Sequence, residues 1–256
     1  MNRSRSRILL LAVLIGTGGM ARGQTAAEHV SLGDKESAAR NATGALQHYE
    51  AALAVDPNDY DALIKAAYVA VELGEFDPSS EHRATLYRSA EQYARRAVAA
   101  NPRDAEGHFQ LAQALGRTAL TMGVRDRVKL ASEIHDDALA ALAIDPKHAG
   151  ALHVMGVWNA EVMRLNGFSR AFARHFLGGK VFDAANWDDA QKYLEGSVAS
   201  EPSRIVHRLD LAAVYADRDQ RAKAIEQYEW IAAAPITDYN DPNYKAEAKR
   251  RLTALR

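Results

Sequence analysis

Apolar residues along this chain recur at the three- and four-residue spacing of amphipathic helices. Four Ala-rich runs of this kind (EAALAV, RRAVAA, LAALAI and GSVAS) are each followed by an acidic or amide residue and then by Pro. Proline just beyond such a run ends a helix, because its ring cannot continue the backbone hydrogen-bond ladder. β-branched residues do not cluster with the two-residue period of a strand. The pattern predicts an all-α protein with helix ends at Asp56-Pro57, Asn101-Pro102, Asp145-Pro146 and Glu201-Pro202.

These helix ends recur regularly, which is typical of an array of helical hairpins. In the first unit, Leu32 and Gly33 are followed by Ala45, Tyr49 and Pro57. These are the offsets and residue types of a 34-residue tetratricopeptide repeat (TPR). A later unit repeats the spacing with Leu211, Ala212, Tyr215, Ala224 and Tyr228. The chain therefore resembles a TPR protein, which implies an α-solenoid in which small residues let paired helices approach closely and Tyr49 fills the gap to the next hairpin.

The middle units are longer than a standard repeat. The four Pro residues are 45, 44 and 56 positions apart, whereas a TPR unit has about 34 residues. Repeat positions still align on both sides of the extra residues, so we expect these residues at the hairpin turns, where they lengthen both helices. The ending YNDPNYKAEAKRRLTAL predicts a helix with Asp241 as its cap and Pro242 at its first position. We expect about five hairpins, elongated central helices and a C-terminal capping helix.

The N-terminus has the order of a secretory signal peptide. Three Arg residues precede an apolar run from Ile8 to Ile15, and small residues lead to Ala21-Arg22-Gly23. The apolar run is shorter than the ~20 residues that span a bilayer, although an uncleaved anchor remains the alternative. We expect a signal peptide over residues 1–23 and one TPR-like helical repeat domain over residues 24–256. The mature protein should be exported, periplasmic or secreted, with no stable transmembrane segment.

Composition and charge narrow the possible functions. The sequence has no Cys, so it forms no disulfide and offers no Cys for lipid attachment. Removing residues 1–23 deletes four Arg and no acidic residue, which changes the formal net charge from −1 to −5. An acidic chain is poorly suited to nucleic-acid binding, which requires a basic surface. No Gly-rich phosphate loop, nucleophile elbow or zinc-binding pair of His occurs. We therefore expect a protein that is not an enzyme and has no metal or cofactor.

An aromatic and basic insert interrupts the hairpin pattern at residues 165–187. It holds four of the six Phe residues of the chain, and three of them recur at four-residue intervals. A helix at about 166–186 would align these three on one stripe and two Arg residues on another. Either this stripe packs on the neighbouring hairpin, or it forms a lid over an apolar groove with basic residues at its mouth. The candidate ligand-contacting residues are Trp158, Arg164, Phe168, Arg170, Phe172, Arg174, His175 and Phe176.

Three features together point to a narrower family. They are the elongated central hairpins, the block at residues 151–202 and the ending from HRLDLAAVYADR to DYNDPNYKAEAKRRL. The block combines a helix containing GVW, a turn containing GF, an FLGG segment and a further hairpin helix. In these features the chain resembles the regulator of microtubule dynamics family, including its bacterial relatives. Some eukaryotic relatives are described as microtubule-associated, and a membrane-contact-site tether is described as holding phospholipid in its TPR domain.

Two functional classes follow from these observations. One is an interaction scaffold of the bacterial cell envelope whose concave groove binds an unidentified protein or peptide. The other is a carrier of a phospholipid, a fatty acid or a similar amphipathic ligand, which the family resemblance and the insert suggest. A groove lined by polar side chains would favour the scaffold, whereas a continuous apolar tunnel would favour the carrier.

Export is directly testable. Because the N-terminal pattern predicts cleavage after Ala21 or Gly23, protein recovered from the envelope fraction should begin near Gln24. Intact-mass measurement would show the loss of the leader. Recovery of only the full-length chain, in the cytoplasm alone, would contradict the prediction.

Overall fold

The computed structural model describes residues 24–165 and 180–256, and every regular element in these ranges is helical. None of the helices in these ranges is both long and apolar enough to cross a membrane. The elements are α1 Ala26–Ala38, α2 Ala42–Val55, α3 Tyr60–Glu75, α4 Ser80–Ala100, α5 Ala105–Leu120, α6 Val124–Ile144, α7 Ala149–Arg164, the 3₁₀ helix η1 Lys180–Asp183, α9 Trp187–Ser200, α10 Ile205–Asp217, α11 Arg221–Ala233 and α12 Asp241–Leu255.

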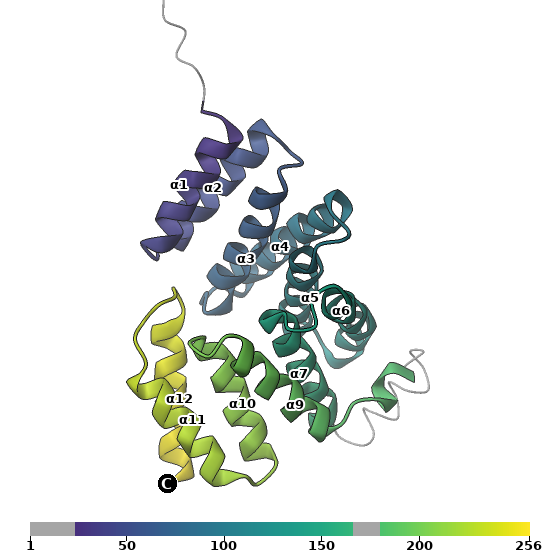
Figure 1. Ribbon diagram of the computed structural model, residues 1–256, viewed down its shortest axis with the longest axis vertical. Helices are drawn as coiled ribbons and strands as arrows, with labels where there is room; N and C mark the ends of the chain where they lie inside the picture. Colours follow the sequence, from purple (N-terminus) through teal and green to yellow (C-terminus); the bar gives the residue numbers. More distant parts are fainter. Residues whose placement is uncertain (1–23, 166–179) are drawn as a thin grey trace, which may run out of the picture.

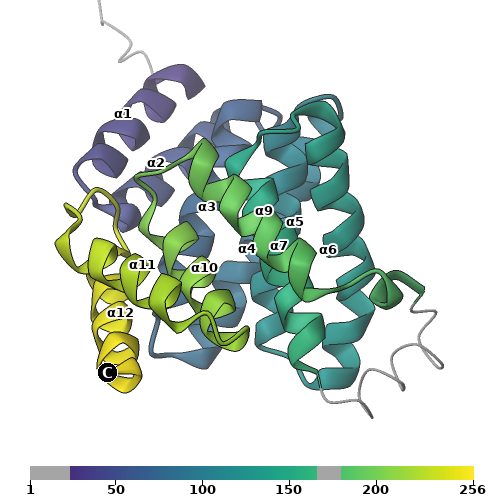
Figure 2. The same ribbon diagram turned by 60° about the horizontal axis from the view of Figure 1, so that its bottom comes forward.

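Successive helices pack as hairpins and each hairpin packs against the next (Figure 1). The pairs are α1–α2, α3–α4, α5–α6, α7–α9 and α10–α11, and α12 packs on the last pair. Figure 2 shows the resulting curved stack from a second side. The described residues thus confirm the expected TPR-like α-solenoid of five hairpins with a C-terminal capping helix.

The predicted helix ends are confirmed, and each has the same local cause. The residue before Pro donates its backbone N–H to the carbonyl four positions earlier, which completes the last turn before Pro stops the helix. The first two stops are followed by Asp59 and Asp104, whose side chains accept hydrogen bonds from the first turn of the next helix. A short Pro-containing turn therefore ends one hairpin and starts the next.

Glycine lets the paired helices of a hairpin approach closely. A Cβ added at Gly33 would lie 2.4 Å from the Tyr49 ring, and one at Gly74 would lie 2.5 Å from the Tyr87 ring. Tyr49 therefore covers the first helix of its own hairpin, where its hydroxyl donates to Asp34 Oδ1 at 2.9 Å. It also belongs to the apolar cluster shared with α3, so it contributes to both contacts.

The lengthening of the central hairpins is confirmed for two of the three long units. Helices α3 and α5 each have 16 residues and α4 and α6 each have 21, compared with 13 in α1 and 14 in α2. In the third long unit, the prediction that both helices lengthen is wrong, because α9 has only 14 residues. The extra residues lie in the connection between α7 and α9, of which residues 166–179 lie outside the described ranges.

The start of α12 also differs from the prediction. Asn240, not Asp241, is the N-cap residue, and Pro242 therefore takes the second helical position. The Asp241 carboxylate instead accepts backbone N–H bonds from Thr237 and Asp238, both at 2.7 Å. It stabilises the preceding loop because that loop carries donors with no helical partner.

Two Gly-to-Ala changes distinguish the effect of steric overlap on the free energy of unfolding from the effect of helix propensity. Gly33→Ala should lower the free energy of unfolding by about 1–3 kcal/mol, because the new methyl group overlaps the Tyr49 ring. Gly116→Ala is the matched control: no atom lies within 4 Å of its added Cβ, so the change should raise stability by up to about 1 kcal/mol. Urea unfolding monitored by circular dichroism would measure both values. Equal shifts in the two variants would contradict the packing argument.

Candidate functional site

A concave groove of about 620 Å³ runs along the first helices of the hairpins. Residues from α1, α3, α5, α7 and α10 line it, and α12 contributes Tyr244. The lining carries both signs of charge. The cations include Lys65, Arg117, Lys147 and Arg204, and the anions include Asp34, Glu72, Glu106 and Glu201.

The middle of the groove is a set of polar side chains that hold one another in place. Gln110 Nε2 donates to Glu106 Oε1 at 2.7 Å, and His148 Nε2 lies 3.1 Å from the other oxygen of that carboxylate. The amide oxygens of Gln110 and Gln113 are buried and have no hydrogen-bond partner within the described part of the chain. Because these two oxygens have almost no accessible surface, the groups that the groove presents to a ligand are the partly exposed ones, such as the Glu106 carboxylate.

Two neighbouring imidazoles, tilted by 36° to each other, also line the groove. The rings of His153 and His207 are 4.8 Å apart, and His153 Nε2 lies 2.8 Å from Asp210 Oδ2. Burial lowers the pKa of His207 to about 2, so this ring stays neutral at physiological pH. No group of acidic, His or Cys side chains among the described residues is suited to holding a metal ion. The His153 and His207 rings, with Asp210, are therefore suited to hydrogen bonding.

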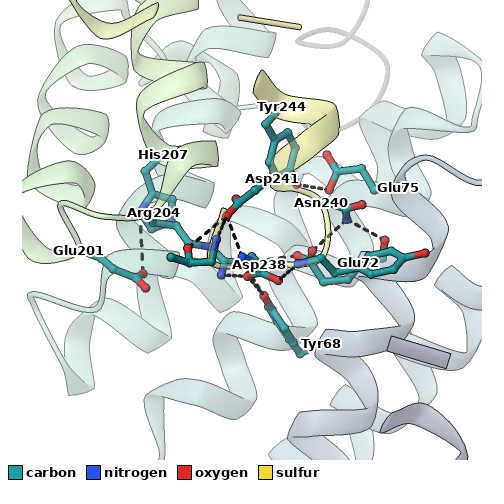
Figure 3. A network of polar contacts seen from close by, with 12 residues as sticks. Tyr68, Glu72, Glu75, Glu201, Arg204, His207, Asp238, Asn240, Asp241 and Tyr244 are labelled. Atoms are coloured by element: carbon teal, nitrogen blue, oxygen red, sulfur yellow. Dashed lines mark hydrogen bonds and ion pairs between the residues drawn. The ribbon is translucent and has the colours of Figure 1, made fainter. Parts of the chain in front are cut away.

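The loop between α11 and α12, residues 234–240, closes one end of the groove and is called the C-terminal loop below. Asn240 Nδ2 donates to the backbone carbonyl of Glu72 at 2.8 Å and to its Oε2 at 2.9 Å (Figure 3). Asp238 accepts a hydrogen bond from the Tyr68 hydroxyl at 2.9 Å and forms an ion pair with Arg204. These contacts join the last hairpin to the second one.

Further contacts support this closure on both sides. Arg40 Nη1, at the turn of the first hairpin, donates to the backbone carbonyl of Ile236 at 3.2 Å. Tyr244 in α12 donates to Glu75 Oε2 at 2.7 Å. Figures 1 and 2 accordingly show the C-terminal loop beside the first two hairpins. The solenoid is thus bonded end to end.

Glu72 is the most unusual ionisable group in this network. Its side chain is only 4% exposed and Asn240 is fully buried. Burial raises the pKa of Glu72 to about 7, despite the opposing effect of Arg204. Near neutral pH the carboxyl group is therefore distributed between its charged and protonated forms.

Comparison with known proteins identifies the family. The sequence profile of the family described as "Regulator of microtubule dynamics protein 1-3" (RMD1-3) matches residues 26–256. This chain belongs to the RMD1-3 family. The match confirms the resemblance seen in the sequence, and it covers all of the described helices. RMD1-3 and TPR proteins are generally binding modules without catalytic activity.

A solved structure supports the fold of this RMD1-3 member. A thermophilic TPR protein from Thermus thermophilus, TTC0263, is 21% identical with a TM-score of 0.64, over 88% of this chain and 99% of that chain. The pilF structure from Pseudomonas aeruginosa is 16% identical with a TM-score of 0.48, over 90% of this chain and 91% of that chain. At 21% identity, the similarity to TTC0263 shows the TPR fold alone. No curated protein is similar enough to this sequence to count as a relative.

Two of the predicted site residues of this family member, Trp158 and Arg164, are described and do not line the groove. Trp158 is buried in α7, where its Nε1 donates to the Ala131 carbonyl at 2.8 Å and its ring stacks on Phe182. Arg164 forms ion pairs with Glu161 and Asp217 at the other end of α7. The remaining candidates lie outside the described residues and stay predictions: Phe168, Arg170, Phe172, Arg174, His175 and Phe176.

Sequence reasoning missed the groove residues of this RMD1-3 chain, although a signal for many of them exists. In α3, Lys65, Tyr68 and Glu72 are spaced so that they share one helical face, and polar residues of α5 follow the same rule. These positions did not stand out in the sequence, because a polar stripe is typical of any surface helix. No local pattern connects Glu72 to Asn240.

Glu72 should make stability depend on pH. The folded protein binds its proton more tightly than the unfolded chain, so stability is lost as pH rises from the ordinary pKa of 4.5 through about 7. Glu72→Gln removes this titration and can still accept from Asn240. The variant should exceed the wild-type free energy of unfolding by on the order of 2 kcal/mol at pH 8, and by much less at pH 5.

Urea unfolding at both pH values would measure this difference. Arg204, Asp238, Glu75 and Arg117 act on Glu72 in the folded state and are retained in both proteins. Glu226→Gln, on the exposed face of α11, is the matched control and should show the same difference from wild type at both pH values. The explanation is wrong if Glu72→Gln behaves like this control.

Proposed function

We propose that this RMD1-3 member is a non-enzymatic scaffold whose concave groove binds an extended segment of a protein partner. The observation that carries the proposal is the lining of the groove, where polar side chains of neighbouring hairpins are held by one another. An extended peptide presents backbone N–H groups along its length, and these require acceptors when they are buried. The partly exposed carboxylates of Asp34, Glu106 and Glu201 supply such acceptors.

The charge of the groove supports a polypeptide over other polymers. The groove contains both cationic and anionic side chains, and the whole chain has a formal net charge of −1. A nucleic acid would require a uniformly basic surface. A polypeptide carries both signs of charge and can match such a surface.

The proposal includes action in the bacterial cell envelope, in the periplasm or after secretion. Its support is the Arg-rich start, short apolar run and small residues of the first 23 positions. In that compartment the absence of Cys makes the fold independent of redox conditions.

A second candidate function is binding of an amphipathic ligand such as a fatty acid or phospholipid, and one observation favours it. A separate apolar pocket between α5, α6 and α7 is lined by Leu120, Ile134, Val157, Trp158, Val162 and Phe182, among others. Its volume is about 140 Å³, whereas ligand pockets usually measure ~300–1,000 Å³. The groove is the larger site, so we rank the scaffold first.

Site-specific photocrosslinking would test the scaffold. A photoreactive amino acid placed at Lys65 or Lys147, which line the groove, should crosslink a partner polypeptide in envelope extracts. The same group at Lys192, on the exposed side of α9, is the matched control and should not. Equal crosslinking from all three positions would contradict groove binding. Mass spectrometry of natively purified protein that reveals lipid, without any groove crosslink, would favour the carrier.

A further inference from the structure

The C-terminal loop binds the same side chains that line the groove. Tyr68, Glu72 and Arg204 are groove residues, and all three contact Asp238 or Asn240 of the loop. The loop has no regular secondary structure, and its Ile236 and Tyr239 side chains are 45% and 41% exposed. Residues 238–240 form a turn, in which the Asp241 N–H donates to the Asp238 carbonyl at 3.4 Å, so a peptide ligand that makes the same turn would present the same two side chains to the groove.

The contacts define the chemistry that this end of the groove recognises. The Asp238 carboxylate meets a guanidinium and a phenol hydroxyl, which are strong donors to a carboxylate. Two residues later, the Asn240 amide nitrogen donates both to the Glu72 carbonyl and to its carboxyl oxygen. These two acceptors match the two N–H groups of a side-chain amide.

Part of this arrangement does not depend on the loop. Arg204 packs over the Tyr68 ring, with its guanidinium carbon 5.6 Å from the ring centroid, and also contacts the Tyr68 hydroxyl. Arg204 and Glu72 form an ion pair at 3.5 Å. The loop itself is an imperfect ligand, because Asn240 Oδ1 is buried without a hydrogen-bond partner among the described residues.

We propose that the part of the groove formed by Tyr68, Glu72 and Arg204 is a recognition site for a segment that carries a carboxylate and, two residues later, a side-chain amide. In this structure the protein's own Asp238 and Asn240 hold the site, and a partner segment with the same pair displaces them. The inference rests on the proposed scaffold function and specifies the chemistry of its partner. It also explains why the polar side chains of the C-terminal loop are complementary to those of the second hairpin.

Because the C-terminal loop is part of the same chain, it competes strongly with a free peptide for the recognition site. A segment linked to its site acts at an effective concentration that reaches the millimolar range. A free peptide with the same sequence cannot displace it at micromolar concentration. A natural partner must therefore gain further contacts along the groove, whereas a variant with a weakened loop should accept the free peptide.

Fluorescence polarisation with a labelled peptide would test the proposal on the intact protein. The probe has the sequence of residues 234–243, APITDYNDPN. The variant Asp238→Ala/Asn240→Ala should bind it at least tenfold more tightly than the wild type does. Arg204→Ala added to this variant should abolish the gain, and a probe with Ala in place of its first Asp and first Asn should bind neither protein.

Further variants keep the test decisive. Asp238→Asn weakens the ion pair with little change of shape, and it should also bind the probe more tightly than the wild type does. It replaces the double variant in the test if the double variant loses its helical circular dichroism. Asp188→Ala, which removes a partner of Arg218 elsewhere on the surface, should bind the probe as weakly as the wild type. The proposal is overturned if folded loop variants bind no better than wild type, or bind the Ala-substituted probe equally well.

The two proposals fail in different ways. A groove crosslink to a partner, with no probe binding by the loop variants, overturns the recognition site and leaves the scaffold function intact. Probe binding by the loop variants, with no crosslink from Lys65 or Lys147, supports the recognition site and overturns the scaffold function.

Discussion

The close approach of the two helices in each hairpin is the constraint on which the molecule depends. A tyrosine ring lies where Gly33 and Gly74 have no side chain, and Leu194 takes the same role at Gly156. Many other core positions are alanines with no exposed surface, among them Ala45, Ala66, Ala90, Ala112, Ala138 and Ala212. Small residues at these contacts make each hairpin thin, so that the first helices stack side by side and their polar faces form one continuous groove.

The polar groups of that groove follow from the same packing. Because much of the apolar surface is buried between hairpins, many side chains on the concave side are charged or amide-bearing, and they bond to one another within and across neighbouring repeats. Glu106 joins Gln110 and His148 in this way, and Asp34 joins Tyr49 and Lys65. Such pairs fix the orientation of the groove surface without filling it.

The fold could be predicted from the sequence because it follows local patterns, whereas the site depends on contacts between residues far apart in the chain. Proline stops and glycine contacts act within one hairpin, so their spacing revealed the repeats and the family. The length of α9 was misjudged because a long connection and a long helix give the same proline spacing. Asn240 was missed because its partner lies 168 positions away. Trp158 and Arg164, chosen for their neighbours in sequence, line other pockets. Only the superhelix brings the true groove residues together.

The end-to-end contact also changes how the chain gains its structure. In an open solenoid each repeat touches only its neighbours, so folding can start anywhere and the terminal repeats fray independently. Here Arg40 and Glu72 are bonded to the C-terminal loop, so the unfolding of the first hairpins is coupled to that of the last hairpin. This tie raises the mean sequence separation of native contacts, which slows folding. It also couples the repeats into one cooperative unit whose opening exposes the whole concave surface together.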